Sequence, residues 1–365
     1  MLLHGLLHLI GAARGFRWLD PPRLDLRIGT AEAAVWLAAA VLIVTTAVGM
    51  RAGGTWWWIT GALGLAISQG LIIRAWADAR AGTIANIILA VAVVYGLAAY
   101  GPWGFRTEYR DRVGASLTTL RSGPVLGLED LRGLPAPIVR YVRRSGAVGK
   151  PRVSAFRAHF HGRIRASEGD AWMSYTGEQV NRYAPDGASR LFFMDATRAG
   201  MPVDVLHTFV AGEARMRVKL ASLLPMVDTS GPEMTRSETV TLFNDLMLLC
   251  PGAIIAAPIE WQTLTDTHVR GVFTNGVHTV SADLYFDDQG DLVDFRSEDR
   301  SRSLDDDSLV RQPWSTPIGD HRVFDGWRVA SRGEGRWHAP DPEGEFTYLE
   351  FNLDGIEYDP AGDGG

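Results

Sequence analysis

The stretch from Trp261 to Asp299 constrains the fold most strongly, because it has the pattern of an antiparallel meander. Asn275 and Gly276 separate two segments rich in Val, Thr and Phe, and this pair suits a tight hairpin turn that needs positive φ. Apolar and polar residues alternate from Val280 to Phe286, which indicates a strand with one buried face and one polar face. Most of residues 152–359 alternates in this way, so the sequence predicts an antiparallel sheet.

One segment inside this region changes to a helical period. In Thr235–Cys250 the apolar residues recur at helical spacing, and Thr235 followed by Glu238 has the pattern of a capping box. Pro251 and Gly252 end the predicted helix. About ten antiparallel strands cannot bury themselves as a flat sheet, so we expect a curved half-barrel with this helix in its concave face. The predicted fold class is α+β.

The first 103 residues differ from the rest, because they are nearly continuous apolar runs. Thr30–Met50, Trp56–Trp76 and Thr83–Tyr100 each approach the roughly 20 residues that cross a bilayer as a helix. Tryptophans at the segment ends suit the headgroup level of a membrane. We therefore predict three membrane spans, and we favour Met1–Ala13 as a fourth helix of a compact bundle.

Arginines in the short loops set the predicted orientation. The loop before Thr30 holds Arg14, Arg17, Arg23 and Arg27, which places it in the cytoplasm and the large C-terminal part outside. The predicted domains are a transmembrane helical bundle over 1–103, a juxtamembrane helical connector over 104–150, the half-barrel over 151–360 and a disordered tail over 361–365.

Polar side chains inside the apolar segments have two interpretations. His4 and His8 are four residues apart and share a helix face, a spacing that suits metal or haem ligands. The alternative is that both histidines form hydrogen bonds within the bundle. Ser68, Gln69 and Asn86 are expected to make hydrogen bonds between helices.

Composition and motifs exclude several function classes. The net charge of -6 over 365 residues leaves no basic surface for nucleic acid, and the single Cys250 excludes an internal disulfide. The chain has no G-x-S-x-G, H-E-x-x-H or phosphate-loop motif, which favours a binding protein over an enzyme. We expect no cofactor and no metal, because His159 and His161 lack an obvious third ligand and Asp305–Asp307 lacks the ligand spacing of a calcium loop.

Several segments resemble an uncharacterised bacterial family, namely LPAPIVRYVRRSGAVGKPRV, TLFNDLMLLCPGAIIAAPIEW, DLYFDDQGDLVDFRSEDR and GEFTYLEFNLDGIEYD. The similarity covers about Leu134–Asp359, and HGLLHLIG near the N-terminus resembles the membrane part of this family. The resemblance implies the half-barrel fold of lipoprotein-localisation factors, which are periplasmic carriers of lipid chains. It implies no catalytic residues.

A curved sheet with an apolar concavity suits an elongated apolar ligand. We therefore predict a membrane-anchored, extracytoplasmic protein that binds a lipid or other lipophile and acts in envelope lipid or lipoprotein handling. The residues expected to contact the ligand are Phe243, Asn244, Asp245, Met247, Trp261, Phe286, Arg296 and Arg300.

Two alternative functions stay open. Asp245 interrupts an apolar helix and could be a buried acid with a raised pKa in a hydrolase or isomerase. It could equally pair with Arg296 or Arg300, or face water. The soluble domain could instead be a sensor or assembly factor that recruits an envelope protein, which an apolar patch on its convex face would support. Glu298, Asp299 and Arg300 are expected to form a charged set on an edge strand.

Overall fold

The computed structural model describes residues 1–19, 28–117, 123–184, 187–303 and 308–360. The chain forms two compact units, Met1–Glu108 and Tyr109–Gly365. Three features of the sequence lie outside the described residues: Arg23 and Arg27 of the predicted cytoplasmic loop, Asp305–Asp307, and the tail over 361–365.

The first unit consists of helices. They are α1 (Leu2–Gly15), α2 (Thr30–Arg51), α3 (Trp57–Arg74), α4 (Trp76–Ala79) and α5 (Gly82–Tyr100), followed by the start of α6 (Phe105–Leu117). Helix α1 packs on α2, α2 on α3, and α3 on α5. By length and composition, two segments of the described residues are apolar enough to cross a membrane, Thr30–Arg51 and Gly82–Leu117. The predicted bundle of three or four spans therefore stays a prediction.

Several polar side chains are buried between the helices of this unit. His4 Nε2 lies 2.8 Å from Asn86 Oδ1, and His8 Nε2 lies 2.8 Å from the hydroxyl of Ser68. Ser68 also donates to Asn86 Oδ1, and Asn86 in turn donates to Gln69. The predicted hydrogen bonds between helices are thus present, and the two histidines take part in them. Large apolar side chains are instead exposed on α1 and α5, among them Leu3, Leu6, Ile84, Ile88 and Val91.

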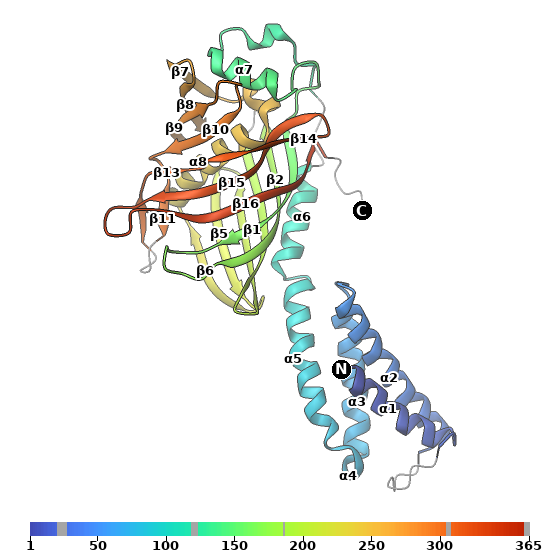
Figure 1. Ribbon diagram of the computed structural model, residues 1–365. Coiled ribbons are helices and arrows are strands. Elements are labelled where there is room, and N and C mark those ends of the chain that lie inside the picture. The colour runs from blue at the N-terminus through green and yellow to red at the C-terminus, as the bar shows by residue number, and fades with distance from the viewer. Residues whose placement is uncertain (20–27, 118–122, 185–186, 304–307, 361–365) are drawn as a thin grey trace. The chain divides into compact units, whose positions relative to one another are not determined.

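The second unit is built on one large antiparallel sheet (Figure 1). Its first six strands are β1 (Ala155–Ile164), β2 (Met173–Ala184), β3 (Gly187–Arg198), β4 (Met201–Val210), β5 (Glu213–Leu220) and β6 (Leu224–Ser230). After helix α8 (Pro232–Leu249) and the 3₁₀ turn η2 (Pro251–Ala256) come β7 (Ile259–Thr265), β8 (His268–Asn275), β9 (His278–Phe286) and β10 (Leu292–Ser297). The last strands are β13 (Trp314–Ser315), β14 (Ile318–Phe324), β15 (Trp327–His338) and β16 (Glu345–Tyr358).

The sheet curves into a half-barrel (Figure 1). The order of its strands is β6-β5-β4-β3-β2-β1-β16-β15-β13-β10-β9-β8-β7, with β14 paired to β15. The last strand, β16, pairs with the first, β1, so it joins the two halves of the sheet. Strands β11 (Ser301–Ser303) and β12 (Leu309–Arg311) form a separate two-stranded ribbon, and the remaining helices are the 3₁₀ turn η1 (Leu128–Leu131) and α7 (Ala136–Arg144).

The predicted hairpin at Asn275 and Gly276 is present, but its turn lies one residue later. Asn275 pairs with His278, so Gly276 and Val277 are the two central residues of the turn. Gly276 has φ 62°, and a glycine with positive φ at the first central position is what a type II′ turn requires. Asn275 stays in the strand, where its side chain accepts a hydrogen bond from the Ala188 backbone.

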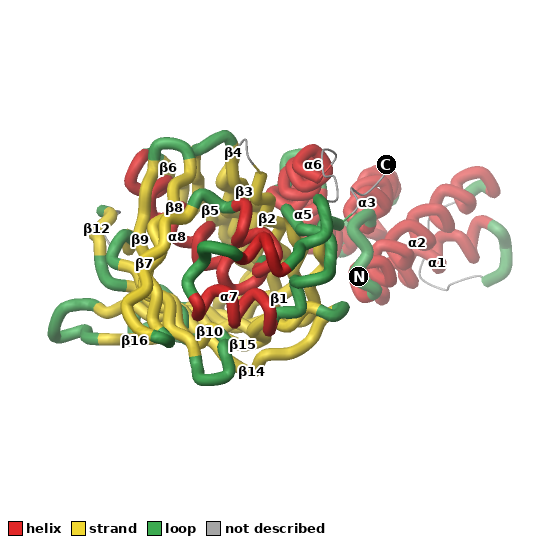
Figure 2. Tube along the Cα trace, turned by 90° about the horizontal axis from the view of Figure 1, so that it is seen from above, coloured by secondary structure: helices red, strands yellow, loops and turns green. Residues whose placement is uncertain are grey.

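Helix α8 lies inside the curve of the sheet, as predicted, and Figure 2 shows the strands curving round it. It begins at Pro232, three residues earlier than expected, with Gly231 as its N-cap and no side-chain cap. The predicted capping box of Thr235 and Glu238 is therefore wrong. Proline suits the first position of a helix because its missing N–H would have no partner there, so the helix extends back to Pro232 and both residues lie inside it.

Phe243 in the apolar stripe of α8 packs against aromatic rings of β7, β8 and β10. The ring of Phe243 lies 5.3 Å from the rings of Phe273 and Phe295, and 6.4 Å from that of Trp261. Gly271 leaves room for this packing, because a Cβ atom there would lie 2.7 Å from the ring of Phe243. The half of the hollow under β7–β10 is thus filled with side chains.

We predict that Phe243→Ala lowers the free energy of unfolding by about 3–5 kcal/mol, the usual cost of deleting a buried phenylalanine ring. The reason is that Phe243 is fully buried among aromatic rings, which cannot close the space it leaves. Chemical denaturation of the full chain in detergent measures the change. Val323→Ala on the exposed face of β14 is the control, with an expected change within about 0.5 kcal/mol. A loss for Phe243→Ala as small as that of the control contradicts the prediction.

Candidate functional site

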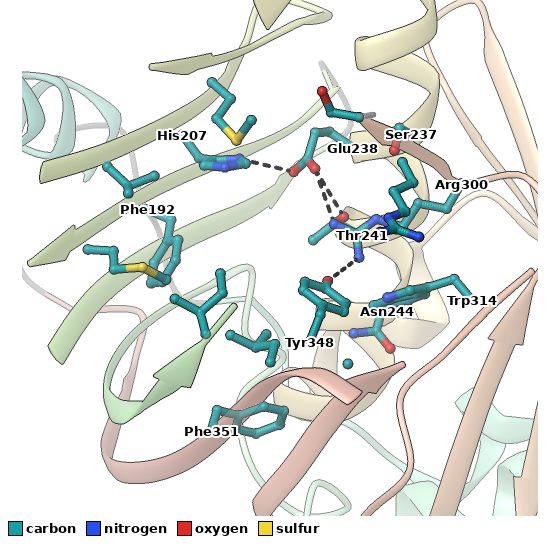
Figure 3. Close-up of a pocket in the computed structure, with 18 of the residues that line it drawn as sticks. Phe192, His207, Ser237, Glu238, Thr241, Asn244, Arg300, Trp314, Tyr348 and Phe351 are labelled. Carbon is teal, nitrogen blue, oxygen red and sulfur yellow. Dashed lines mark hydrogen bonds and ion pairs between the residues drawn. The ribbon is translucent and has the colours of Figure 1, made fainter. Parts of the chain in front are cut away.

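A cavity of about 460 Å³ lies between α8 and the sheet, and its lining comes from β1–β6 and from β11–β13, β15 and β16 (Figure 3). The exposed residues Ala166 and Ser303 are part of its lining and mark the end that reaches the surface. The predicted concavity is therefore present beside the polar face of α8.

The walls of the cavity change from polar to apolar along the strands. On β3, alternate residues line the cavity in the order Arg190, Phe192, Met194 and Ala196. On β4, Val203, Val205 and His207 line it, and strand pairing sets Phe192 opposite His207, Met194 opposite Val205 and Ala196 opposite Val203. The apolar end of both strands lies toward the β3–β4 turn, where Met201 is exposed.

Helix α8 turns its polar side chains toward the cavity. These residues are Ser237, Glu238, Thr241, Asn244 and Asp245, and all of them are buried. Their spacing of three and four residues places them on one face of the helix. This face lies opposite the strands that carry Arg190 and His207, so charged groups from the helix and the sheet meet inside the protein.

Glu238 is the centre of this polar cluster. Its Oε2 lies 3.4 Å from Arg190 Nη1 and 3.6 Å from His207 Nδ1, and its Oε1 lies 3.6 Å from Arg300 Nη2. Burial by itself would raise the pKa of this carboxyl, but His207, Arg190 and Arg300 outweigh it and hold the pKa well below its usual range. Glu238 is therefore an anion inside the protein.

Asp245 lies two turns further along α8 and has a different environment. Its Oδ2 accepts hydrogen bonds from Gln179 at 2.7 Å, Asn181 at 3.0 Å and Arg190 Nε at 2.9 Å. Burial raises the pKa of Asp245 above its ordinary value, although Arg190 and the hydrogen bonds oppose this shift. The two carboxyls of one helix face thus have pKa values shifted in opposite directions.

Arg300 reaches the cluster from the loop after β10. Its guanidinium lies 4.3 Å from the centre of the Trp314 ring and 5.5 Å from that of Trp337, and Nη1 donates to the hydroxyl of Tyr348 at 3.0 Å. Stacking on two indoles compensates a buried guanidinium for lost hydration. These contacts hold the orientation of Arg300 beside the cavity (Figure 3).

Several buried polar atoms of the lining have no hydrogen-bond partner among the described residues. They are His207 Nδ1, Asn244 Oδ1, Arg300 Nε, Arg302 Nε, Trp314 Nε1 and Thr316 Oγ1. Most buried polar atoms of folded proteins are hydrogen-bonded, and a group of exceptions in one place calls for water or a ligand. The cluster therefore has unused capacity for hydrogen bonds.

Three of the eight predicted contact residues line the cavity: Asn244, Asp245 and Arg300. The remaining five do not. Phe243 and Met247 belong to the apolar stripe of α8, Trp261 and Phe286 pack in the same filled half of the sheet, and Arg296 is paired with Asp294 at 2.6 Å on an exposed position. The prediction assumed that the apolar stripe of α8 faces the open space of the half-barrel, whereas most residues of α8 that line the cavity are polar.

Two predicted charge arrangements are also corrected. Asp245 pairs with Arg190, and not with Arg296 or Arg300. Arg300 is not part of an edge-strand charge set, because its side chain is buried beside Glu238. Asp299 instead pairs with Arg236 at the start of α8 and accepts from the Ser281 backbone.

Sequence reasoning missed Arg190, His207 and Glu238. Arg190 occupies a position that strand alternation assigns to the buried face, together with Phe192 and Met194. A charged residue at such a position is rarely buried without a partner, so it was a usable signal. His207 gave the same signal on β4, and Glu238 was hidden by its resemblance to a capping residue.

Among the described residues, no group of three or more His, Cys, Asp or Glu could hold a metal ion. His161 is exposed and pairs with Asp354 at 2.7 Å. Cys250 is buried, and burial raises the pKa of its thiol.

A comparison with known protein families identifies the family of the part of the chain that holds this cavity. The model of the family of unknown function DUF6544 matches residues 124–351. The chain belongs to this family. The resemblance to an uncharacterised family inferred from the sequence is thereby confirmed for the DUF6544 region, whereas the match does not extend to the N-terminal helices. No curated protein matches the chain.

Two solved structures are similar to the chain. One is a domain from Vibrio parahaemolyticus named as an outer membrane lipoprotein-sorting protein domain, with a TM-score of 0.36 and 11% identity over 61% of this chain and 92% of that domain. The other is a DUF1329 family protein from Desulfovibrio piger, with a TM-score of 0.36 and 12% identity over 61% of this chain and 92% of that protein. Because both TM-scores are low, the half-barrel of this chain is described from the pairing of its own strands.

We predict that Glu238→Gln lowers the free energy of unfolding by about 3–5 kcal/mol near pH 7, since it leaves buried cations without their counterion. An unfolded glutamate has a pKa of about 4.3, and the pKa of Glu238 in the folded protein is lower. The charge of Glu238 therefore contributes stability above roughly pH 4.3, and this contribution is lost as the pH falls toward the folded pKa.

Denaturation of the wild type and Glu238→Gln at a series of pH values tests this. The matched control is Asp228→Asn, which breaks a half-exposed pair with Arg215 and should cost about 1 kcal/mol or less. If the difference between the wild type and Glu238→Gln grows as the pH falls below about 4, the assignment of Glu238 as a buried anion is wrong.

Proposed function

We propose that this DUF6544 protein is a membrane-anchored, extracytoplasmic binding protein for a lipid or other lipophile, with a role in envelope lipid or lipoprotein handling. The observation that carries the proposal is the cavity beside α8, which the side chains of the half-barrel leave unfilled. Its volume of about 460 Å³ falls within the range of small-molecule sites, which are mostly apolar pockets with a few placed polar groups.

The character of the walls supports a lipophilic ligand. Met194, Ala196, Val203, Val205 and Val218 cover the strands at the apolar end of the cavity. Methionine side chains are flexible and adapt to ligands of varied shape. A long apolar chain would gain about 25 cal/mol for each Å² that it removes from water against these residues, so this part of the cavity suits an acyl chain.

The helical unit supports an anchor in the membrane. Its large apolar side chains are exposed on α1 and α5, while His4, His8, Ser68 and Asn86 are buried and bonded to one another. This arrangement reverses the usual pattern of a water-soluble helical protein. It suits a lipid environment, in which polar side chains between helices bond to each other.

The contacts of the cavity do not favour the alternative of an enzyme that uses Asp245. The oxygen Oδ2 of Asp245 already accepts three hydrogen bonds, and the histidine of the cavity, His207, contacts Glu238. For the alternative of a sensor, the convex face of β3 is partly covered, since Tyr109 of α6 lies against Phe193. We therefore propose no second function.

We predict that Val205→Trp reduces the amount of lipid that copurifies with the full chain. Val205 lines the cavity at its apolar end, so an indole there occupies space that a ligand would need. The measurement is native mass spectrometry, with quantified organic extraction, of protein purified in detergent. Thr263→Trp on the exposed edge strand β7 adds the same side chain outside the cavity and should leave the bound lipid unchanged. Equal lipid content in all three proteins, or none in the wild type, contradicts the proposal.

A second prediction concerns orientation. The native Cys250 is buried, so a cysteine placed at Val277, which is 92% exposed, should be the reactive thiol of the half-barrel. We expect a membrane-impermeant maleimide to label Val277→Cys in intact cells or in spheroplasts. Trp18→Cys lies in the predicted cytoplasmic loop and should react only after permeabilisation. The reverse labelling pattern would place the half-barrel in the cytoplasm.

A further inference from the structure

The polar end of the cavity has more donors than acceptors to offer a ligand. Of the unpartnered buried atoms in the lining, Arg300 Nε, Arg302 Nε and Trp314 Nε1 can only donate, His207 Nδ1 and Thr316 Oγ1 can donate or accept, and Asn244 Oδ1 can only accept. A ligand group rich in acceptors can satisfy five of these six atoms. An apolar group would leave all of them unpaired, at a cost of about 1–3 kcal/mol each.

The ion pairs of the cluster are long, which leaves its cations available. Glu238 has contacts of 3.4–3.6 Å with Arg190, His207 and Arg300, whereas charge-assisted hydrogen bonds usually measure about 2.7–2.9 Å. A second anion could therefore approach Arg300 more closely than Glu238 does. The two indoles and Tyr348 already hold the guanidinium in place, so ligand binding would cost little ordering of this side chain.

The lining as a whole is also cationic. It contains four arginines, at positions 165, 190, 300 and 302, and two carboxylates, Glu238 and Asp245. Arg302 is neutralised by Glu343 at 2.7 Å, and the hydrogen bonds that fix Arg165 go to backbone carbonyls of Thr347 and Glu168. With Glu343 included, four arginines face three carboxylates, so one positive charge is in excess, which favours an anion over a cationic group.

We propose that the cavity binds a single-chain amphiphile with an acidic head of the carboxylate or phosphate-monoester class, and that the head enters first and lies beside Arg300, His207 and Trp314. The inference rests on the proposed function and specifies its ligand. The acyl chain runs from this polar end along Met194, Val205 and Val203 toward the surface. This orientation follows the polarity of the walls, since the reverse would press a methyl end against the buried charges of α8.

Matched ligands test the head without any change to the protein. The full chain in lipid nanodiscs is loaded with a fluorescent fatty acid, which is displaced by hexadecanoic acid, hexadecanol or hexadecyl phosphate, with empty discs correcting for partition. We expect one or both acids to displace the probe at concentrations about 10- to 100-fold lower than the alcohol, as charged hydrogen bonds imply. The better of the two acids identifies the head as carboxylate or phosphate.

Variants test the position of the head. Arg300→Gln should reduce the affinity for the better acid to that for the alcohol, and leave the affinity for the alcohol within about twofold. Arg296→Gln is the matched control, because Arg296 is close in sequence but lies outside the cavity lining, and we expect no change. If Arg300→Gln does not fold, Trp314→Phe removes the Nε1 donor but keeps a ring under Arg300, and should weaken the acid about three- to tenfold.

The outcomes separate this inference from the function on which it rests. Equal displacement by the acids and the alcohol overturns the acidic head but leaves lipophile binding intact. No displacement by any of the three overturns lipophile binding itself. Loss of acid preference in Arg165→Gln, but not in Arg300→Gln or Trp314→Phe, would place the head at the surface end and overturn the orientation.

Discussion

A helix enclosed by a sheet has no face in contact with water, and this constraint determines the structure of the half-barrel. Helix α8 meets it differently on its two sides. Its apolar stripe packs against aromatic rings of β8 and β10, where Phe243 is fully buried. Its other side carries Glu238 and Asp245, which cannot stay charged or hydrogen-bonded inside the protein without partners from the strands. Arg190 supplies a partner to both acids, so it fixes the helix against the sheet.

The division of the hollow follows from this arrangement. The polar face of α8 meets strands that carry Met194, Ala196, Val203 and Val205, and these side chains leave a cavity of about 460 Å³ unfilled. On the other side of α8, Phe243 packs against the rings of Phe273, Phe295 and Trp261. The cavity thus forms where the polar face of the helix meets the sheet. The same residues that hold the helix in place also provide the chemistry of the site.

Most of the fold of the half-barrel could be predicted from sequence, because alternation and turn residues are local signals. The strands, the hairpin near Gly276 and the inserted helix follow from patterns within a few residues. The site depended on which face of α8 points to β1–β6, and this is decided by contacts between distant residues such as Arg190 and Asp245, 55 positions apart. Glu238 illustrates the limit: a threonine three residues before a glutamate predicts a cap, but Pro232 starts the helix earlier and turns the glutamate inward. The number of membrane spans is a different case. Helix α3 packs against both α2 and α5, yet among the residues that the structure describes only Thr30–Arg51 and Gly82–Leu117 are long and apolar enough to be recognised as spans.

The buried charges on α8 favour a cavity that selects among apolar ligands. If the cavity had only to accept apolar chains, an apolar face on α8 would serve better, because replacing buried ion pairs with well-packed apolar residues is often neutral or stabilising. Proteins depart from such local optimisation mainly at functional sites. Here the departure places unpaired donors beside an apolar wall, so a ligand without acceptors would leave them unsatisfied and bind less well. The apolar wall provides affinity for many lipophiles, and the cluster around Glu238 and Arg300 selects among them.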